Sequence, residues 1–421
     1  MTRSAAMRWP SRYACSTSTR TTSDSPVAWV SGLRKEFRLR PAGRKRGFTA
    51  VSGLFYSLPY LAIGLWQSFG NRGRPHSMKA INRIIERART SPGRIVLSEA
   101  EEPRMLQAAR RATREGIARI VLVGSAAGIH EAAAREGVDL SGMEVVDPAT
   151  SPLAASFAEE LFALRSRKGM TLDEAKREIL KPLCFANLMV RLGHADGSVA
   201  GSVYTTADVV RNAIQIIGIQ PSFKLVSSFF LMMLCEPFHT LKGGLIFSDC
   251  GLVVDPDAGE LAEIAMAAAD SAQSLLMDEP RVAMLSFSTS GSARHAAVDK
   301  VVEATRQVRA LRPHLAIDGD VQLDAAIVSE IAMRKIEHSQ VQGHANVLIF
   351  PSLEAGNIGY KLAERIGGAK AIGPLLQGLK KPANDLSRGC SADDVYYVIA
   401  VTCVQAQTAA ELMKTQTAPH A

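Results

Sequence analysis

Short apolar runs with strand character alternate with helical patterns along most of this chain, and no other feature constrains its fold more. We expect strands at 94–98, 119–123, 143–146, 198–202, 225–234, 244–247, 282–287, 315–317, 347–350 and 369–372. Helical patterns lie at 81–88, 102–115, 125 to about 135, 152–193, 260–276, 292–311, 324–334, 355–366 and 395–410. Repeated strand–helix units predict mostly parallel sheets covered by helices on both faces. So many strands favour two α/β domains over one.

The first 77 residues differ from the rest in charge. They contain 13 Lys/Arg and 2 Asp/Glu, whereas the remaining 344 residues contain 36 and 39. The mildly acidic body therefore does not predict a nucleic-acid partner. Residues 48–66 carry no charge and follow Arg44-Lys45-Arg46, a pattern that also resembles a signal anchor. We favour Met78 as the functional start, with 1–77 a disordered or non-native extension, over membrane anchoring.

Cysteine spacing and glycine motifs exclude several classes of site. The six cysteines form no CxxC pair and no Cys/His cluster with zinc spacing, so we expect no metal site and no structural disulfide. This usage predicts a reducing, cytoplasmic location. The sequence has no GxGxxG after the first strand, no GxxxxGK[ST] and no GxSxG. A Rossmann nicotinamide site, a P-loop and a hydrolase elbow are therefore not indicated.

The segment 384–394 (NDLSRGCSADD) concentrates polar chemistry between a strand-like run and a long apolar helix. A polar loop that leads into a helix N-terminus can bind an anion, and Arg388 can grip a phosphate with two hydrogen bonds. A simpler interpretation is a capping box in which Ser391 caps the helix and Asp394 stands at its third position. That cap would not explain Arg388 or Gly389.

Four blocks together carry a family resemblance: LSRGCSADD at 386–394, AMLSFSTSGSA at 283–293, AIDGDVQLDAAI at 316–327 and ANVLIFPSLEAGNIGYKL at 345–362. In this order they resemble the phosphate acetyltransferase (phosphotransacetylase) family, from about Met78 to Gln407. The resemblance implies the reaction acetyl-CoA + phosphate ⇌ acetyl phosphate + CoA, by direct thiolate attack in a ternary complex. CoA and acetyl-CoA are then substrates, and no bound cofactor is expected.

The resemblance also implies an architecture. It is similar to that of isocitrate and isopropylmalate dehydrogenases: two three-layer α/β domains with mostly parallel sheets and the site in the cleft between them. The first domain would be discontinuous, pairing 78–222 with 374–421, and the second would span 223–373. A homodimer is expected.

Matching the family's motif residue by residue gives the candidate site. Ser387 and Arg388 take the places of its catalytic serine and arginine, and Asp394 that of the second acid in its closing pair. Arg165 and Arg211 match arginines expected to bind substrate phosphates, although which binds which phosphate stays open.

Asn212 and Cys390 lie next to or near these candidate residues in the sequence. Asn212 stands where the family usually has proline after the second arginine, so the local turn could differ. Cys390 has no histidine beside it in the sequence. We interpret Cys390 as a packing residue, with a covalent acetyl-enzyme the minor alternative.

Three other functions are alternatives to phosphate acetyltransferase. Phosphate butyryltransferase is the nearest, because the sequence does not show the size of the acyl pocket. A non-catalytic acetyl-CoA-sensing domain is disfavoured by the intact Ser387, Arg388 and Asp394. An NADP-linked decarboxylating dehydrogenase would need clustered metal-binding aspartates and a nucleotide loop, which the sequence lacks.

Overall fold

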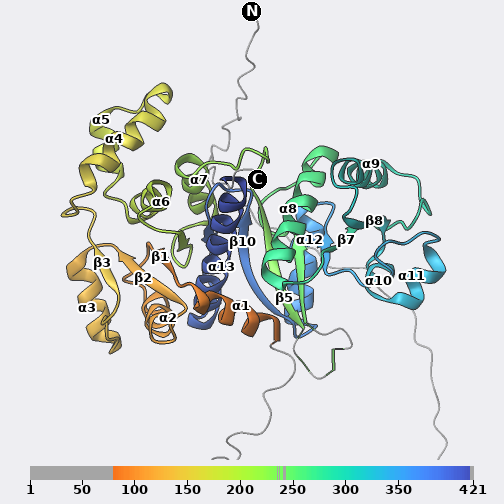
Figure 1. Cartoon of the computed structure of the whole chain (residues 1–421), viewed down its shortest axis with the longest axis horizontal. Helices are drawn as coiled ribbons and strands as arrows, with labels where there is room; N and C mark the ends of the chain where they lie inside the picture. Colours follow the sequence, from red (N-terminus) through yellow and green to blue (C-terminus); the bar gives the residue numbers. More distant parts are fainter. Residues whose placement is uncertain (1–78, 235, 237, 240–242, 418–421) are drawn as a thin grey trace, which may run out of the picture. The chain divides into compact units, whose positions relative to one another are not determined.

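The computed structural model describes residues 79–234, 236, 238–239 and 243–417 (Figure 1). The expectations for 1–77, including the uncharged segment 48–66, lie outside the described residues. Within the described part, no helix combines the length and the hydropathy needed to cross a bilayer. The described residues belong to one compact unit that contains two β-sheets.

The first sheet is entirely parallel and has the strand order β11-β4-β1-β2-β3. Its strands are β1 (Gly93–Leu97), β2 (Ala118–Val123), β3 (Glu144–Val146), β4 (Gly197–Ala200) and β11 (Ala383–Asp385). In the register, Val199 pairs with both Leu97 and Asn384. The carboxyl ends of β1, β4 and β11 therefore meet at one edge of the sheet, where ligands bind in parallel α/β sheets.

The second sheet is mixed and has the order β10-β5-β6-β9-β7-β8. Its strands are β5 (Ser227–Leu234), β6 (Gly243–Ser248), β7 (Arg281–Leu285), β8 (Ala316–Val321), β9 (Val347–Ile349) and β10 (Lys370–Gln377). β5 runs antiparallel to both β6 and β10, and the other pairs are parallel. The prediction of mostly parallel α/β structure is confirmed.

Helices cover both faces of each sheet. In β1, Ile95 and Leu97 face the cluster that holds α2 and α13, while Val96 faces the cluster of α4, α6 and α7. In β7, Val282 faces α8 and α9, while Ala283 faces the α10–α12 side. The helices are α1 (Lys79–Thr90), α2 (Pro103–Arg114), α3 (Ala126–Glu136), α4 (Ala154–Arg165), η2 (Ser166–Lys168), α5 (Leu172–Glu178), α6 (Pro182–Leu192), α7 (Thr206–Ile216), α8 (Ala258–Leu276), α9 (Ala296–Leu311), α10 (Leu323–Ile327), α11 (Ser329–Lys335), α12 (Leu353–Arg365) and α13 (Ala392–Thr417).

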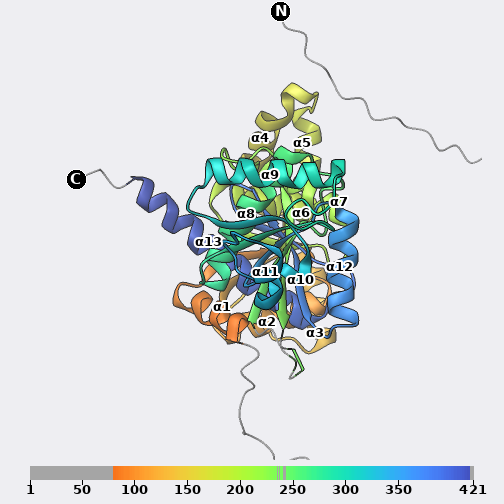
Figure 2. The same cartoon turned by 90° about the vertical axis from the view of Figure 1, so that its right-hand side faces the viewer.

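The long helix α13 contacts strands of both sheets, β1, β4 and β11 in the first and β10 in the second (Figure 1). Its buried run from Val395 to Val404 packs against α1, α2 and α8. Figure 2 shows its last turns projecting beyond the neighbouring helices. Because its N-terminus follows β11 directly, α13 fixes the loop 386–391 to the edge of the first sheet.

Two local expectations are wrong. The helix expected from Ser292 begins at Ala296 with His295 as its N-cap, because the Ser292 hydroxyl instead accepts a hydrogen bond from Thr289 N at 3.0 Å. The helix expected over 324–334 is broken at Val328, which is extended (φ −126°, ψ 111°) and separates α10 from α11.

Candidate active site

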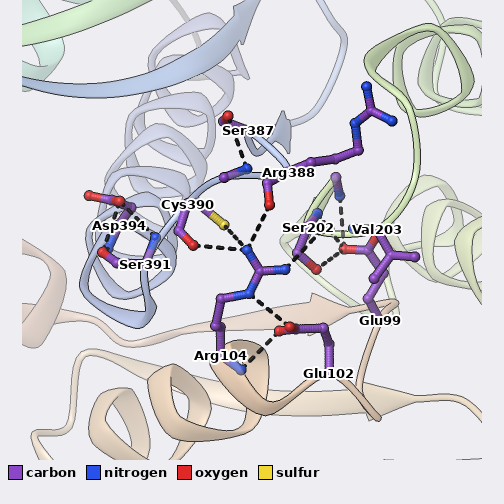
Figure 3. A network of polar contacts seen from close by, with 12 residues as sticks. Glu99, Glu102, Arg104, Ser202, Val203, Ser387, Arg388, Cys390, Ser391 and Asp394 are labelled. Atoms are coloured by element: carbon purple, nitrogen blue, oxygen red, sulfur yellow. Dashed lines mark hydrogen bonds and ion pairs between the residues drawn. The ribbon is translucent and has the colours of Figure 1, made fainter.

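The loop between β11 and α13 changes abruptly from buried to exposed. Leu386 is buried, whereas Ser387, Arg388 and Gly389 are exposed. A turn closes between Cys390 N and Ser387 O at 2.9 Å, and the Ser387 hydroxyl accepts from Gly389 N at 3.3 Å. In the described structure the Arg388 side chain makes no hydrogen bond or ion pair, and it extends away from Asp394 (Figure 3). Its guanidinium therefore keeps its full capacity to bind an anion.

The capping box predicted from the sequence is confirmed at the start of α13. Asp394 Oδ2 accepts from Ser391 N at 2.9 Å and from Ser391 Oγ at 2.8 Å, while Asp394 N donates to Ser391 Oγ at 3.2 Å. The other oxygen, Oδ1, lies 3.9 Å from Lys370 Nζ, and about one third (32%) of the side chain is exposed. One carboxylate oxygen of Asp394 thus holds the helix start, and the other is turned toward a cation.

Arg104, on the first turn of α2, holds this loop through hydrogen bonds to its backbone carbonyl oxygens. Its guanidinium donates to Arg388 O at 2.8 Å, to Cys390 O at 2.9 Å and to Ser202 O at 3.1 Å (Figure 3). A 2.7 Å ion pair with Glu102, the N-cap of α2, orients the guanidinium and raises the pKa of Arg104. Sequence reasoning missed this residue. The one available signal was its place just after a strand and a polar turn.

Glu99, which follows β1, holds the neighbouring loop after β4. Its buried carboxylate accepts from five donors: Gly201 N at 2.9 Å, Ser202 N at 2.7 Å, Ser202 Oγ at 2.5 Å, Val203 N at 2.8 Å and Tyr204 N at 2.6 Å. Sequence reasoning gave Glu99 no role. Hydrogen bonds to a charged acceptor are the strong ones, so this loop is rigidly positioned.

Asp385, the last residue of β11, is also buried, but neither of its oxygens has a hydrogen-bond partner among the described residues. The Thr206 hydroxyl and the Leu386 N–H lie near enough to favour the charged form, without hydrogen-bond geometry. Burial outweighs them and, with the charge of Glu99, raises the pKa of Asp385 to about 7. Sequence reasoning gave Asp385 no role of its own.

The Cys390 side chain is buried, and its sulfur lies 3.7 Å from an Arg104 nitrogen. Burial raises the pKa of its thiol to about 11, although the charge of Arg104 opposes this. The thiolate is the nucleophilic form of cysteine. The surroundings of Cys390 therefore favour the packing interpretation over the covalent one.

The two candidate substrate-binding arginines lie on other elements than this loop. Arg165 is the last residue of α4, before η2. Arg211, on α7, is exposed and pairs with Asp208 at 3.0 Å. Neither guanidinium contacts the loop 386–391 through a hydrogen bond or ion pair of the described residues. Asn212 has a local role, since its amide oxygen accepts from Asn187 Nδ2 at 2.7 Å.

In the described structure, the loop 386–391 therefore offers an exposed hydroxyl and an unpaired guanidinium, and the start of α13 adds a partly exposed carboxylate. These groups suit the binding of a phosphate and the transfer of a group to or from it. Among the described residues, no group of three or more His, Cys, Asp or Glu side chains could hold a metal ion.

Sequence comparison gives the class of protein. Residues 79–403 match the family described as phosphate acetyl/butaryl transferase, so the chain belongs to that family. The chain is 50% identical over 330 residues to the phosphate acetyltransferase of Thermoanaerobacterium thermosaccharolyticum, covering 78% of the chain and 100% of that protein. It is 48% identical over 328 residues to the phosphate acetyltransferase of Paracoccus denitrificans, covering 78% and 99%.

Solved structures agree with this assignment. The EutD phosphotransacetylase from Staphylococcus aureus superposes with a TM-score of 0.72 at 40% identity, covering 78% of this chain and 99% of that one. A phosphotransacetylase from Streptococcus pyogenes gives 0.73 at 38% identity, covering 78% and 98%. A branched-chain phosphotransacylase from Enterococcus faecalis shares the fold, with a TM-score of 0.54 at 18% identity over 74% of this chain and 98% of that one.

Proposed function

We propose that this protein is a phosphate acetyltransferase that transfers an acetyl group reversibly between CoA and inorganic phosphate. The family match over 79–403 carries the proposal, and the exposed Ser387 hydroxyl and Arg388 guanidinium support it. Relatives of 43–50% identity are named for acetyl transfer, which favours acetyl over butyryl as the acyl group. CoA, acetyl-CoA, phosphate and acetyl phosphate are then its small-molecule substrates.

The chemical step is a direct transfer within a ternary complex. In the direction that forms acetyl-CoA, the CoA sulfur attacks the acetyl carbon, the carbon–oxygen bond to phosphate breaks, and the electron pair leaves with the phosphate oxygen. A free thiol with a pKa near ~8.5 is mostly protonated at neutral pH, so a base must take its proton. Asp394 is our candidate, because its Oδ1 is not committed to the capping box.

Ser387 and Arg388 are proposed to stabilise the charge that moves during this step. The Ser387 hydroxyl can donate to the carbonyl oxygen or to the sulfur while its oxygen accepts from Gly389 N. Arg388 can hold the phosphate with two parallel hydrogen bonds and neutralise the leaving group. Arg165 and Arg211 are proposed to bind phosphates of CoA or inorganic phosphate, Arg211 with Asp208 beside it.

A division into two domains, 78–222 with 374–421 and 223–373, fits the two sheets. The chain leaves the first sheet after α7 and returns through 378–382, and these two connections pair at Ile219 and Leu379. β10 runs across position 374, so the second boundary falls inside a strand. We propose an isocitrate dehydrogenase-like arrangement, with substrates bound in a cleft between the domains.

We also propose a homodimer in the cytoplasm. Ile358 (59%) and Leu362 (51%) on α12 and its C-cap residue Ile366 (80%) are exposed and spaced four residues apart. An exposed apolar stripe of this kind is typical of a protein interface. The reducing environment of the cytoplasm suits Cys184, Cys250, Cys390 and Cys403, which are free thiols.

The proposal is tested by measuring CoA release, as free thiol, from acetyl-CoA with and without phosphate. Release that depends on phosphate is expected, with butyryl-CoA turned over more slowly. The assay should be run on the full-length chain and on a shortened protein that begins at Met78. Thiol release that is independent of phosphate would contradict the proposal, and faster turnover of butyryl-CoA would reassign the acyl group.

A further inference from the structure

The end of β11 holds the described structure's most unusual carboxylate. Four other acids are buried: Glu99, Asp249 and Asp318 each accept at least three hydrogen bonds from backbone N–H groups or hydroxyls, and Asp320 accepts one from Gly291 N at 3.3 Å. Both oxygens of Asp385 accept none from any described residue. The side chain is fully buried, so bulk water does not replace these missing partners. Buried polar groups usually have partners, and an exception calls for an explanation.

The surroundings of Asp385 leave little room for a charge. A Cβ built on Gly201 would collide with Asp385 Oδ1, and it would lie 2.6 Å from Leu386 N, so the β4–α7 loop is packed directly on the carboxyl group. On the other side of that loop is the Glu99 carboxylate, whose negative charge further disfavours ionisation. A buried, unpaired charge costs several kcal/mol, and a nearby charge of the same sign raises that cost.

The charged groups on the elements packed against β11 are committed elsewhere, and Arg388, in the loop that follows β11, makes no ion pair with Asp385. The neighbouring β4 has no ionisable side chain. On α7, Asp208 and Arg211 pair with each other. On α13, Asp394 holds the capping box and faces Lys370 of β10. None of these cations therefore pairs with the β11 carboxylate and offsets the field of Glu99.

We propose that Asp385 carries a proton in the resting enzyme and is a positioning residue for the loop 386–391. In its neutral form it supports the loop from below without opposing an anion. When it loses the proton, a second buried negative charge stands two residues before Ser387 and weakens the binding of the phosphate-bearing substrate. The raised pKa of about 7 agrees with this geometry and places the change within the physiological range. The effect on substrate rests on the function proposed above; the protonation state does not.

The protonation state of Asp385 affects how folding stability depends on pH, and this can be measured without enzyme activity. An aspartate in an unfolded chain titrates near ~3.9. Between that pH and about 7, the folded protein holds a proton that the unfolded chain has lost. The contribution of Asp385 to stability therefore falls as pH rises through this window and is level above it. The Asp385→Asn variant has no such proton to lose.

The first experiment compares the apparent Tm of wild type and Asp385→Asn from pH 5 to pH 8. We expect the Tm of Asp385→Asn to increase relative to the Tm of wild type by roughly 5 °C between pH 5 and pH 8. Asp393→Asn is the matched control, because Asp393 is an exposed carboxylate on α13 that pairs with Arg111 at 2.8 Å. Equal pH dependence of wild type and Asp385→Asn would overturn the proposal.

A second measurement works even if Asp385→Asn does not fold. The infrared carbonyl band of a protonated carboxylic acid can be followed in the wild-type protein as pH is raised. We expect such a band to disappear with a midpoint near pH 7, as the raised pKa of Asp385 requires. Absence of any protonated carboxyl group at pH 6 would overturn the proposal, whatever the variant does.

The positioning role is tested by kinetics with acetyl phosphate and CoA at pH 6 and pH 8. We expect the KM of wild type for acetyl phosphate to rise with pH, and the Asp385→Asn value to be roughly fivefold lower than wild type at pH 8, with kcat little changed. A KM that responds to pH equally in both proteins would refute the positioning role. If the pH-dependent Tm difference appears but no phosphate-dependent activity is found, the proposed function is contradicted. The proposal that Asp385 is protonated is then still supported.

Discussion

Two neighbouring loops at the edge of the first sheet are held in opposite ways. The loop after β4 is held by negative charge, because Glu99 accepts hydrogen bonds from its consecutive backbone N–H groups. The loop after β11 is held by positive charge, because Arg104 donates to its carbonyl oxygens. Clamping carbonyls leaves the side chains of Ser387 and Arg388 pointing outward and exposed. The first loop thus supports the site, and the second carries the two candidate catalytic side chains.

The two carboxylates at this edge teach a more general lesson. Glu99 follows β1 and Asp385 ends β11, two strands of one parallel sheet with β4 between them, and both residues are buried. Glu99 faces five donors, whereas Asp385 faces the backbone of Gly201 and no hydrogen-bond donor with suitable geometry. The number of donors decides whether a buried acid is a stabilising anchor or a group that prefers its proton.

Arg388→Ala should have the largest effect on activity. The guanidinium is exposed and has no partner in the described structure, so its removal costs the fold little but removes the cation that we propose binds the transferring phosphate. We expect kcat to fall by about 10²–10³ with an unchanged Tm. Arg114→Ala, at an exposed arginine on α2, is the matched control and should keep full activity. Near-normal turnover in Arg388→Ala would remove this residue from the mechanism.

Glu99→Gln should separate the two carboxylates by the sign of its effect. The amide NH₂ group turns toward N–H donors that the carboxylate had satisfied, so the β4–α7 loop loses part of its anchor. We expect a loss of about 3 kcal/mol in the free energy of unfolding near pH 7, measured by denaturant titration. Asp385→Asn makes the same chemical change and should stabilise the protein at that pH. Effects of equal sign in the two variants would contradict the distinction between them.

Local pattern explains why much of the fold could be predicted. Alternating strand and helix periods locate β1 to β10 and most helices, since burial imposes those periods on the residues themselves. β11 was missed because its sequence, Ala-Asn-Asp, is polar; Asn384 is buried only because its side chain bonds Leu376 N, Thr402 and Gln405. The break at Val328 is also non-local, since the backbone of Gly343 packs against it.

The candidate site shows the same division. The Ser391–Asp394 cap could be predicted because it lies in one short segment before a helix, the segment that also carries the candidate residues Ser387 and Arg388. The brace from Arg104 could not, because it joins residues 284 positions apart through carbonyl groups that every residue has. The state of Asp385 depends on donors that are missing in three dimensions, which no spacing in the sequence records.

Cys390→Ser should have the smallest effect, and it tests whether the loop's chemistry lies in its exposed or its buried groups. The raised pKa of the thiol, about 11, disfavours the thiolate that a covalent acetyl-enzyme would need. We expect kcat to stay within about threefold of wild type, because the exposed Ser387 and Arg388 are untouched and the proposed transfer is direct, without a covalent acetyl-enzyme. Cys403→Ser, at a core thiol that accepts from Gly93 N, controls for the stability cost of replacing a buried thiol. A loss of several hundredfold in Cys390→Ser, at normal Tm, would instead place the nucleophile beneath the loop and make Arg104, 3.7 Å away, the cation that activates it.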